Sequence, residues 1–185
     1  MTGKQRESEF RFLAEPADVN FGGKVHGGMV MKWIDQAGYA AAVGWSGRYC
    51  VTVAVGGIQF VTPILIGDLV IVRCKLIRTG RTSMHFAVDV VARDLRTAEE
   101  RLATSCVIVF VAMEEGTPAA VPAWRPTTDA DRRLAERAQK LQELSRAMED
   151  QVAHFGEPTD PSSGSVAQAQ RGLTACRPKS AAPKP

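Results

Sequence analysis

Residues 20–38 read Asn-Phe-Gly-Gly-Lys-Val-His-Gly-Gly-Met-Val-Met-Lys-Trp-Ile-Asp-Gln-Ala-Gly, and this stretch decides how the rest of the chain can fold. A glycine-rich loop opens it, and the apolar run that follows predicts a helix over about residues 26–43, closed by Gly44 and Gly47. Apolar side chains surround this helix on nearly every side, which is typical of a buried helix. Asp35 lies in its middle, and a buried acid is costly unless it is paired or used in chemistry.

Strand-like segments accompany the helix, one before it and four after it, at residues 9–13, 50–61, 69–79, 82–93 and 101–113. Gly56 and Gly57 predict a bulge in one strand, and Gly80 predicts a hairpin between two others. One sheet and one apolar helix pack most simply if the sheet curls around the helix. We therefore predict an α+β fold, an antiparallel sheet of about five to six strands around one long central helix. No further helix in this region covers the outer face of the sheet, so part of that face is expected to be wet or covered by another subunit.

The chain divides into one main domain and less regular ends. Residues 1–8 are expected to be an N-terminal extension, and residues 9–126 the main domain. Residues 127–155 predict an amphipathic C-terminal helix that begins near a capping Asp129. Residues 156–185 are rich in Ser, Ala, Pro and Gln and are expected to be a disordered tail.

Composition excludes several classes of protein. The formal net charge of +3 is small and the basic residues are dispersed, so we expect no nucleic-acid partner. Three of the four cysteines lie in apolar strand-like segments and none has metal-binding spacing, which indicates free thiols of a reducing compartment. No apolar run suggests export or a membrane span, so a cytoplasmic protein is expected.

Several motifs in combination resemble the hotdog-fold acyl-CoA thioester hydrolases, in the branch that contains the brain-type and bacterial broad-range acyl-CoA hydrolases. They are the loop Asn20, His26-Gly27-Gly28, the helix acid Asp35, the strand Val51-Thr52-Val53-Ala54-Val55, Phe60-Val61-Thr62-Pro63 and Gly67-Asp68. The resemblance covers roughly residues 9–126. It implies a hotdog fold and hydrolysis of acyl-CoA to a free carboxylic acid and coenzyme A. It implies no metal and no cofactor, because coenzyme A is part of the substrate.

The resemblance also implies roles for residues of the opening stretch. Asp35 would be the catalytic carboxylate, either a general base on water or a nucleophile that forms a transient anhydride. Asn20 would position the water or the thioester. The backbone N–H of Gly27, at the positive end of the helix, would hold the thioester oxygen as it becomes an oxyanion. Gly28 and His26 would lie beside the substrate, His26 as a hydrogen-bonded loop residue.

A second group of candidates lies at the hairpin after the third strand. The resemblance makes Gly80, Arg81, Thr82 and Ser83 candidates for holding the nucleotide or pantetheine end of coenzyme A, because backbone amides and a guanidinium suit phosphate. The simpler interpretation is a polar, basic turn. His85, which follows, is expected to be a surface residue.

Geometry adds a prediction about assembly. Gly27 and Asp35 are separated by about 12 Å along a straight helix, so both cannot touch the same thioester carbon from one chain. If both are catalytic, each site combines two subunits. We therefore predict an obligate dimer with two active sites at its interface, and expect further assembly into a tetramer or hexamer.

Alternatives remain open from the sequence. Asp35 could be a buried acid that anchors a backbone group, and Asn20 an ordinary Asx-turn residue. A hotdog dehydratase could pair His26 with Asp35 for proton transfer at carbon, although Asn20 argues against it. A non-catalytic acyl-CoA-binding sensor usually carries a DNA-binding helix-turn-helix, and none is apparent here. The preferred acyl length is expected to depend on the packing of four aromatic residues, Trp33, Tyr39, Trp45 and Phe60.

Overall fold

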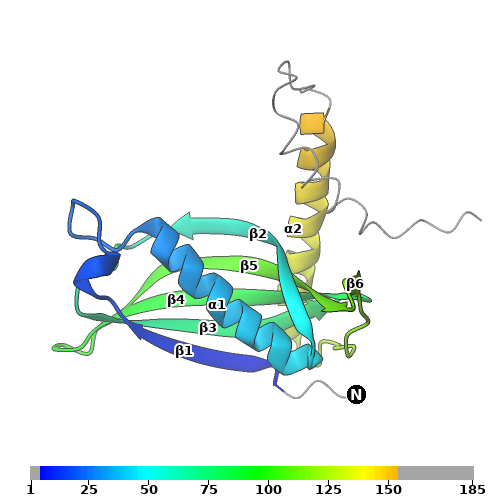
Figure 1. Ribbon diagram of the computed structural model, residues 1–185, viewed down its shortest axis with the longest axis horizontal. Coiled ribbons are helices and arrows are strands. Elements are labelled where there is room, and N and C mark those ends of the chain that lie inside the picture. The colour runs from blue at the N-terminus through cyan, green and yellow to red at the C-terminus, as the bar shows by residue number, and fades with distance from the viewer. Residues whose placement is uncertain (1–4, 154–185) are drawn as a thin grey trace, which may run out of the picture. The chain divides into compact units, whose positions relative to one another are not determined.

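A six-stranded sheet packs one face against a long helix, which confirms the expected α+β architecture (Figure 1). The structure is a computed structural model that describes residues 5–153. Its elements in chain order are β1 (Glu7–Leu13), the 3-10 helix η1 (Pro16–Asp18), α1 (Gly27–Ser46), β2 (Tyr49–Phe60), β3 (Asp68–Thr79), β4 (Ser83–Asp94), β5 (Glu100–Glu114), β6 (Thr117–Pro118) and α2 (Asp129–Ala153). The five expected strands are present, and β6 is a short addition that pairs with β5.

The order of strands explains why α1 crosses the sheet. The strands lie in the order β1-β3-β4-β5-β2, and each neighbouring pair is antiparallel. β3, β4 and β5 follow one another as hairpins, whereas β1 and β2 form the two outer edges. Because α1 connects one edge strand to the other, it must run across the inner face, as Figure 1 shows.

α1 ends later than the sequence pattern predicts. Gly44 lies inside the helix, and the helix closes at Gly47 instead. Gly47 has φ +67°, a left-handed conformation that glycine adopts without strain, and its N–H donates to Val43 O at 2.7 Å. Gly44 is exposed and adds no packing signal that would stop the helix.

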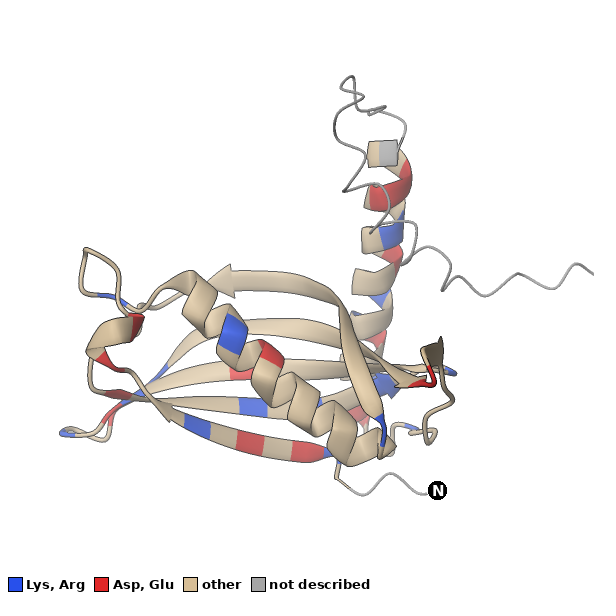
Figure 2. Cartoon of the chain, viewed as in Figure 1, with Lys and Arg blue, Asp and Glu red and all other residues tan. Residues whose placement is uncertain are grey.

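The prediction that α1 is buried on every side is wrong for the single chain. One side packs on the sheet through residues that include Val30, Trp33, Ile34, Ala37 and Ala41. The opposite side is exposed and carries Lys32, Asp35, Gln36, Tyr39 and Ala40. Lys32 and Asp35 are the only charged residues of the helix (Figure 2). The catalytic candidate Asp35 therefore lies on an open face.

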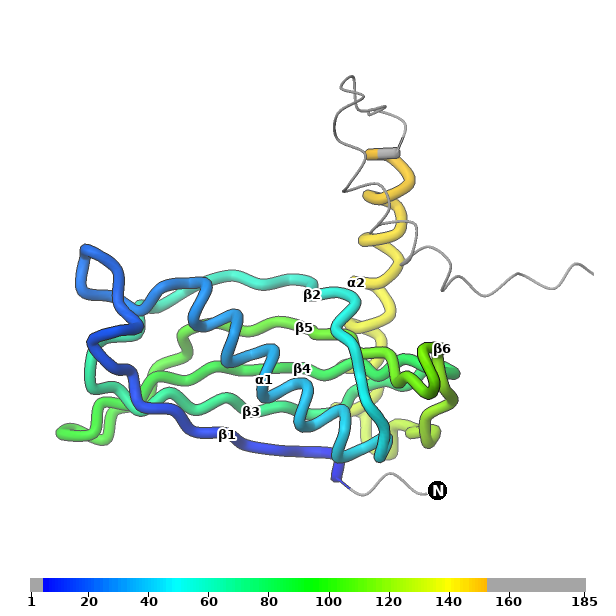
Figure 3. Tube along the Cα trace, in the orientation of Figure 1, coloured from blue at the N-terminus to red at the C-terminus, as the bar shows by residue number. Residues whose placement is uncertain are grey.

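Two bulges shape the edge strand β2, whose trace bends sharply along its length (Figure 3). The pairing of β2 with β5 shifts once between Thr52 and Ala54 and again between Gly56 and Gln59. Gly57, in the second bulge, has φ +67°, so the sequence correctly predicted an irregularity at the glycine pair. Each bulge inserts one extra residue and reverses the alternation of side chains, so two bulges restore it.

The sequence suggested that the outer face of the sheet is wet or covered by another subunit, but α2 of the same chain covers part of it. The part of α2 up to residue 145 packs on it, and Leu134 and Ala138 join Ile77 and Val107 in a second small apolar cluster. His85 on β4 is buried, contrary to expectation, because it lies on this covered face opposite Arg78, which donates a hydrogen bond to Gln142 of α2. The uncovered sheet therefore no longer argues for a dimer.

An ion pair fastens the start of α2 to β3 and β1. Arg6 donates to Leu76 O at 3.1 Å and bonds the Asp131 carboxylate, which is buried. The same guanidinium lies 4.4 Å above the ring of Trp124. Asp131 also accepts from neighbouring groups, and Arg6 chiefly lowers the pKa of its carboxyl to about 2, from the ordinary 3.8.

The cysteines within residues 5–153 are buried and free, as expected. Burial raises the pKa of the Cys74 and Cys106 thiols to about 12. Cys176 and the tail expected over residues 156–185 lie outside the described residues. In the part of the chain that the structure describes, no helix is long and apolar enough to cross a membrane.

Replacing Gly38 should destabilise the fold, because an added side chain would collide with the sheet there. A Cβ at Gly38 would lie 2.8 Å from the ring of Phe110, which is fully buried and packs edge-on against Phe86. We expect Gly38→Ala to lower the free energy of unfolding by about 1–3 kcal/mol. Gly44→Ala, in the same helix but with only Gln5 Oε1 nearby, 3.8 Å from the added Cβ, should raise it by up to about 1 kcal/mol. Urea unfolding of both variants checks this, and an equal effect in the two would contradict it.

The Arg6–Asp131 pair should make stability depend on pH in a defined window. A carboxyl whose pKa is lowered by folding stabilises the fold above its unfolded pKa and loses that contribution as the pH falls through its folded pKa. The stability difference between wild type and Asp131→Asn should be constant above about pH 5 and shrink between about pH 4 and pH 2. Urea unfolding over a pH series measures it. The control is Asp129→Asn, which breaks an exposed pair with Arg132 and should change stability little.

Candidate active site

Asp35 is held by a residue that the sequence did not single out. Thr52 Oγ1, on edge strand β2, donates a hydrogen bond to Asp35 Oδ1 at 2.5 Å. Thr52 pairs with Phe110, a core residue, so its side chain faces α1. Within residues 5–153, the other oxygen of Asp35 accepts no hydrogen bond. In the sequence Thr52 is only a hydroxyl between Val51 and Val53, and nothing local to it indicates a partner in α1.

Asn20 shapes its own loop. Its side-chain oxygen accepts hydrogen bonds from the N–H of Gly22 at 2.8 Å and of Lys24 at 3.3 Å. The N–H of Gly23, which has φ +72°, donates to Asn20 O at 2.9 Å. These bonds form the Asx-turn that was the structural alternative for Asn20. They use only its oxygen, and among the described residues no group accepts from its side-chain amide.

The helix start presents open backbone amides. His26 is the N-cap residue of α1, and its backbone N–H donates to Asp18 O at 2.8 Å. Its side chain is exposed and makes no capping bond. The first N–H groups of a helix have no acceptor within it, so those of Gly27 and Gly28 point out of the helix end. No atom lies within 4 Å of a Cβ built on Gly28, and the ring of Phe60 lies 3.5 Å from one on Gly27.

The hairpin candidates form a tight turn between β3 and β4. The N–H of Gly80 donates to Ser83 O at 2.8 Å, and a Cβ on Gly80 would lie 2.5 Å from Ser83 Oγ, so a larger residue would require the Ser83 hydroxyl to rotate away. The carbonyls of Arg81 and Thr82 accept hydrogen bonds from Val121 and Ala112, which fixes the turn against its neighbours. The Arg81 side chain is exposed, and it has no ion-pair partner in the described part of the chain.

One chain does not bring all the candidates together. Ser83 pairs with Val111 of β5, whereas Phe60, beside Gly27, pairs with Thr104. These positions are about 23 Å apart along β5, so the hairpin and the start of α1 lie at opposite ends of the sheet. Asp35 is bonded to Thr52, which pairs with Phe110 near the hairpin end of β5. Asp35 therefore lies nearer the hairpin, about 12 Å from Gly27 along the helix.

The aromatic residues expected to set the acyl pocket divide into two groups. Trp33 is buried and stacks on Phe12 at 5.6 Å, and Trp45 is buried and donates to Pro122 O at 3.0 Å. Both are therefore structural. Tyr39 and Phe60 are exposed in the single chain, and only they are open to a substrate.

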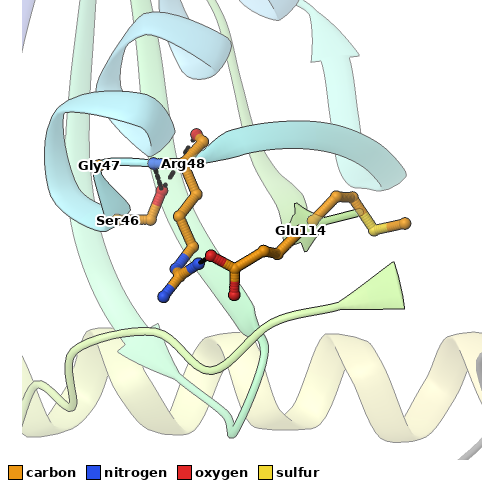
Figure 4. Close-up of a pocket in the computed structure, with 5 residues that line it drawn as sticks. Ser46, Gly47, Arg48 and Glu114 are labelled. Atoms are coloured by element: carbon orange, nitrogen blue, oxygen red, sulfur yellow. Dashed lines mark hydrogen bonds and ion pairs between the residues drawn. The ribbon is translucent and has the colours of Figure 1, made fainter. Parts of the chain in front are cut away.

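A depression at the end of α1 is separate from these candidates (Figure 4). It has a volume of about 340 Å³ and is lined by Ser46, Gly47, Arg48, Met113 and Glu114. Two of its lining residues, Arg48 and Glu114, form an ion pair, and none of the predicted site residues lines it. Within residues 5–153, no cluster of three or more His, Cys, Asp or Glu is arranged to hold a metal ion.

Comparisons with known proteins agree with this fold. Residues 22–99 match the model of the thioesterase superfamily. An uncharacterized acyl-CoA thioester hydrolase of Zymomonas mobilis is 34% identical over 135 residues, which cover 72% of this chain and 88% of that protein.

Solved structures include two similar hexameric enzymes. An apo-hexameric acyl-CoA thioesterase is 30% identical, with a TM-score of 0.73, over 77% of this chain and 92% of that one. HI0827, a hexameric broad-specificity acyl-coenzyme A thioesterase whose structure carries alanine in place of an aspartate, is 29% identical, with a TM-score of 0.59, over 71% and 94%. The chain therefore belongs to the thioesterase superfamily, as a hotdog-fold member of the acyl-CoA thioester hydrolases.

Proposed function

We propose that this protein hydrolyses acyl-CoA to a free carboxylic acid and coenzyme A, with Asp35 as the catalytic carboxylate in a site shared by two copies of the chain. The observation that carries the proposal is the Asp35 carboxylate, held by Thr52 on the open side of α1 in a chain of this family. That HI0827 has been prepared with an aspartate replaced by alanine supports a role for such an acid.

The shared site follows from the separation of Asp35 and Gly27. β2 is an edge strand whose exposed residues include Thr52, Val53 and Phe60, and such an edge pairs readily with another strand. If two β2 strands paired antiparallel with Thr52 beside the second copy's Phe60, the two-fold axis would pass near Gly56. Asp35 of one copy would then approach the Asn20 loop and helix start of the other. Such dimers would assemble further, and two similar enzymes are hexameric.

The chemistry uses only these groups and water. Asp35 takes a proton from water as the water oxygen attacks the thioester carbon. The N–H of Gly27, at the positive end of α1, stabilises the negative charge that forms on the thioester oxygen. The side-chain amide of Asn20 holds the water or the thioester. The C–S bond of the intermediate then breaks to give the acid, and protonated Asp35 returns its proton to the departing coenzyme A thiolate. In the alternative route Asp35 attacks first and water opens the anhydride.

The hairpin would bind the coenzyme A portion. Ser83 lies on β4, two strands from Thr52, so the turn is about 10 Å across the sheet from Asp35. The exposed guanidinium of Arg81 and the turn amides suit phosphate, with Gly80, Thr82 and Ser83 shaping the turn. Buried free thiols fit a reducing compartment, and we propose the cytoplasm.

Removing the carboxylate should abolish turnover without unfolding the chain. We expect Asp35→Ala to lower kcat by about 100-fold or more, because water then lacks its proton acceptor. Steady-state release of free thiol from acyl-CoAs of graded length measures this. Asp129→Ala, at an exposed acid of α2, is the matched control and should retain wild-type activity.

Two results would count against this function. Full activity in a folded Asp35→Ala protein would show that Asp35 is not the catalytic carboxylate. If wild type hydrolyses none of the thioesters tested, the protein is not a thioester hydrolase. Titration with coenzyme A would then test the alternative of a non-catalytic acyl-CoA-binding sensor.

Two inactive variants should restore each other if the site is shared. Asp35→Ala and Asn20→Ala are each expected to be inactive as homodimers. A dimer with one copy of each contains one site that carries both changes and one that carries neither, so it should show about half of wild-type activity. Co-expression with two affinity tags isolates this mixed dimer. If each chain holds a complete site, the mixed dimer will be as inactive as its parents.

A further inference from the structure

The ring of Phe60 lies over the glycine that is proposed to hold the oxyanion. Three ring carbons lie 3.5–3.9 Å from the position that a Cβ of Gly27 would occupy. This is ordinary van der Waals distance, so the ring covers the helix end without crowding it. Any acyl group whose carbonyl oxygen reaches the Gly27 N–H must place its next carbons close to this ring.

The bulges of β2 account for the position of Phe60. Thr52, before the first bulge, pairs with Phe110, and Phe60, after the second, pairs with Thr104. Phe110 and Thr104 are both fully buried on the inner side of β5. Two reversals of the alternation thus return Phe60 to the face of α1, where a single bulge would have turned it away.

The ring is not used to stabilise its own chain. Phe60 is 56% exposed, whereas Trp33 and Trp45 are buried in the core. An exposed aromatic ring beside the first residue of α1 is free to contact a ligand. Two neighbours of Phe60, the Gly27 backbone and the paired Thr104, carry no charge, and Thr104 Oγ1 already donates to Gln59 O at 2.6 Å.

We propose that Phe60 determines the acyl class, by forming an apolar wall for the first carbons beyond the thioester. This inference rests on the proposed hydrolase function and adds its substrate class: acyl groups that are uncharged and apolar next to the carbonyl. A carboxylate within a few carbons of the thioester would lie against the ring without a partner, which is unfavourable.

The test compares butanoyl-CoA with succinyl-CoA, which has the same number of acyl carbons and a terminal carboxylate. Wild type should prefer butanoyl-CoA. Phe60→Ala should lower kcat/KM for butanoyl-CoA by about 10- to 100-fold and change that for succinyl-CoA by less than about 3-fold. Phe60→Arg should move the preference toward succinyl-CoA. Val61→Ala and Val61→Arg, at the exposed neighbouring residue, are matched controls and should leave the ratio unchanged.

The outcomes distinguish failure of this inference from failure of the proposed hydrolase function. Suppose that wild type hydrolyses butanoyl-CoA while the Phe60 variants lower kcat/KM equally for both substrates, or for neither. In that case Phe60 does not determine the acyl class, and the proposed hydrolase function is unaffected. If the Val61 variants shift the ratio as much as the Phe60 variants, the selectivity does not come from Phe60. If wild type hydrolyses no thioester, the proposed function fails as well. The ratio of the two substrates within one preparation is independent of how much of a variant folds.

Discussion

The contact of Gly38 with Phe110 fixes how α1 lies on the sheet. Any side chain there would collide with a fully buried ring, so the backbone of the helix must rest directly on the Phe110 side chain. The same contact sets the rotation of the helix, which turns Asp35 and Gln36 outward. Asp35 can then receive the hydrogen bond of Thr52 across the edge of the sheet. The candidate chemistry thus depends on a packing contact that carries no polar group.

The two bulges of β2 also shape the edge of the sheet where Asp35 and Thr52 meet. β2 carries two bulges, and these keep Thr52 and Phe60 on one face although the strand bends between them. On the opposite face α2 covers the sheet, and Arg6 with Asp131 fastens its first turn. The open side of α1 and the β2 edge are left as the surfaces on which a ligand or a second chain can lie.

Periodicity predicted most of the fold, because period-two and period-3.6 patterns report directly which side of an element is buried. It failed where burial depends on distant parts of the chain. The apolar pattern predicts that α1 is buried all round, although Lys32 and Gln36 mark its open side. It also predicts a surface position for His85, because nothing local shows that α2 covers it. Asn20, Gly27 and Asp35 were found by their resemblance to a family. Thr52 was missed since its role arises only when β2 folds beside α1.

The open β2 edge has a consequence for the life of the protein in the cell. A strand with unpaired backbone groups and exposed Val53 and Phe60 is a template for any extended chain until a second copy occupies it. If pairing completes the fold, thermal stability rises with protein concentration, as mass action requires. Newly made chains would be most vulnerable to unfolding and to pairing with other extended chains when their concentration is low. The level of synthesis would then determine both how much enzyme exists and what fraction of it survives.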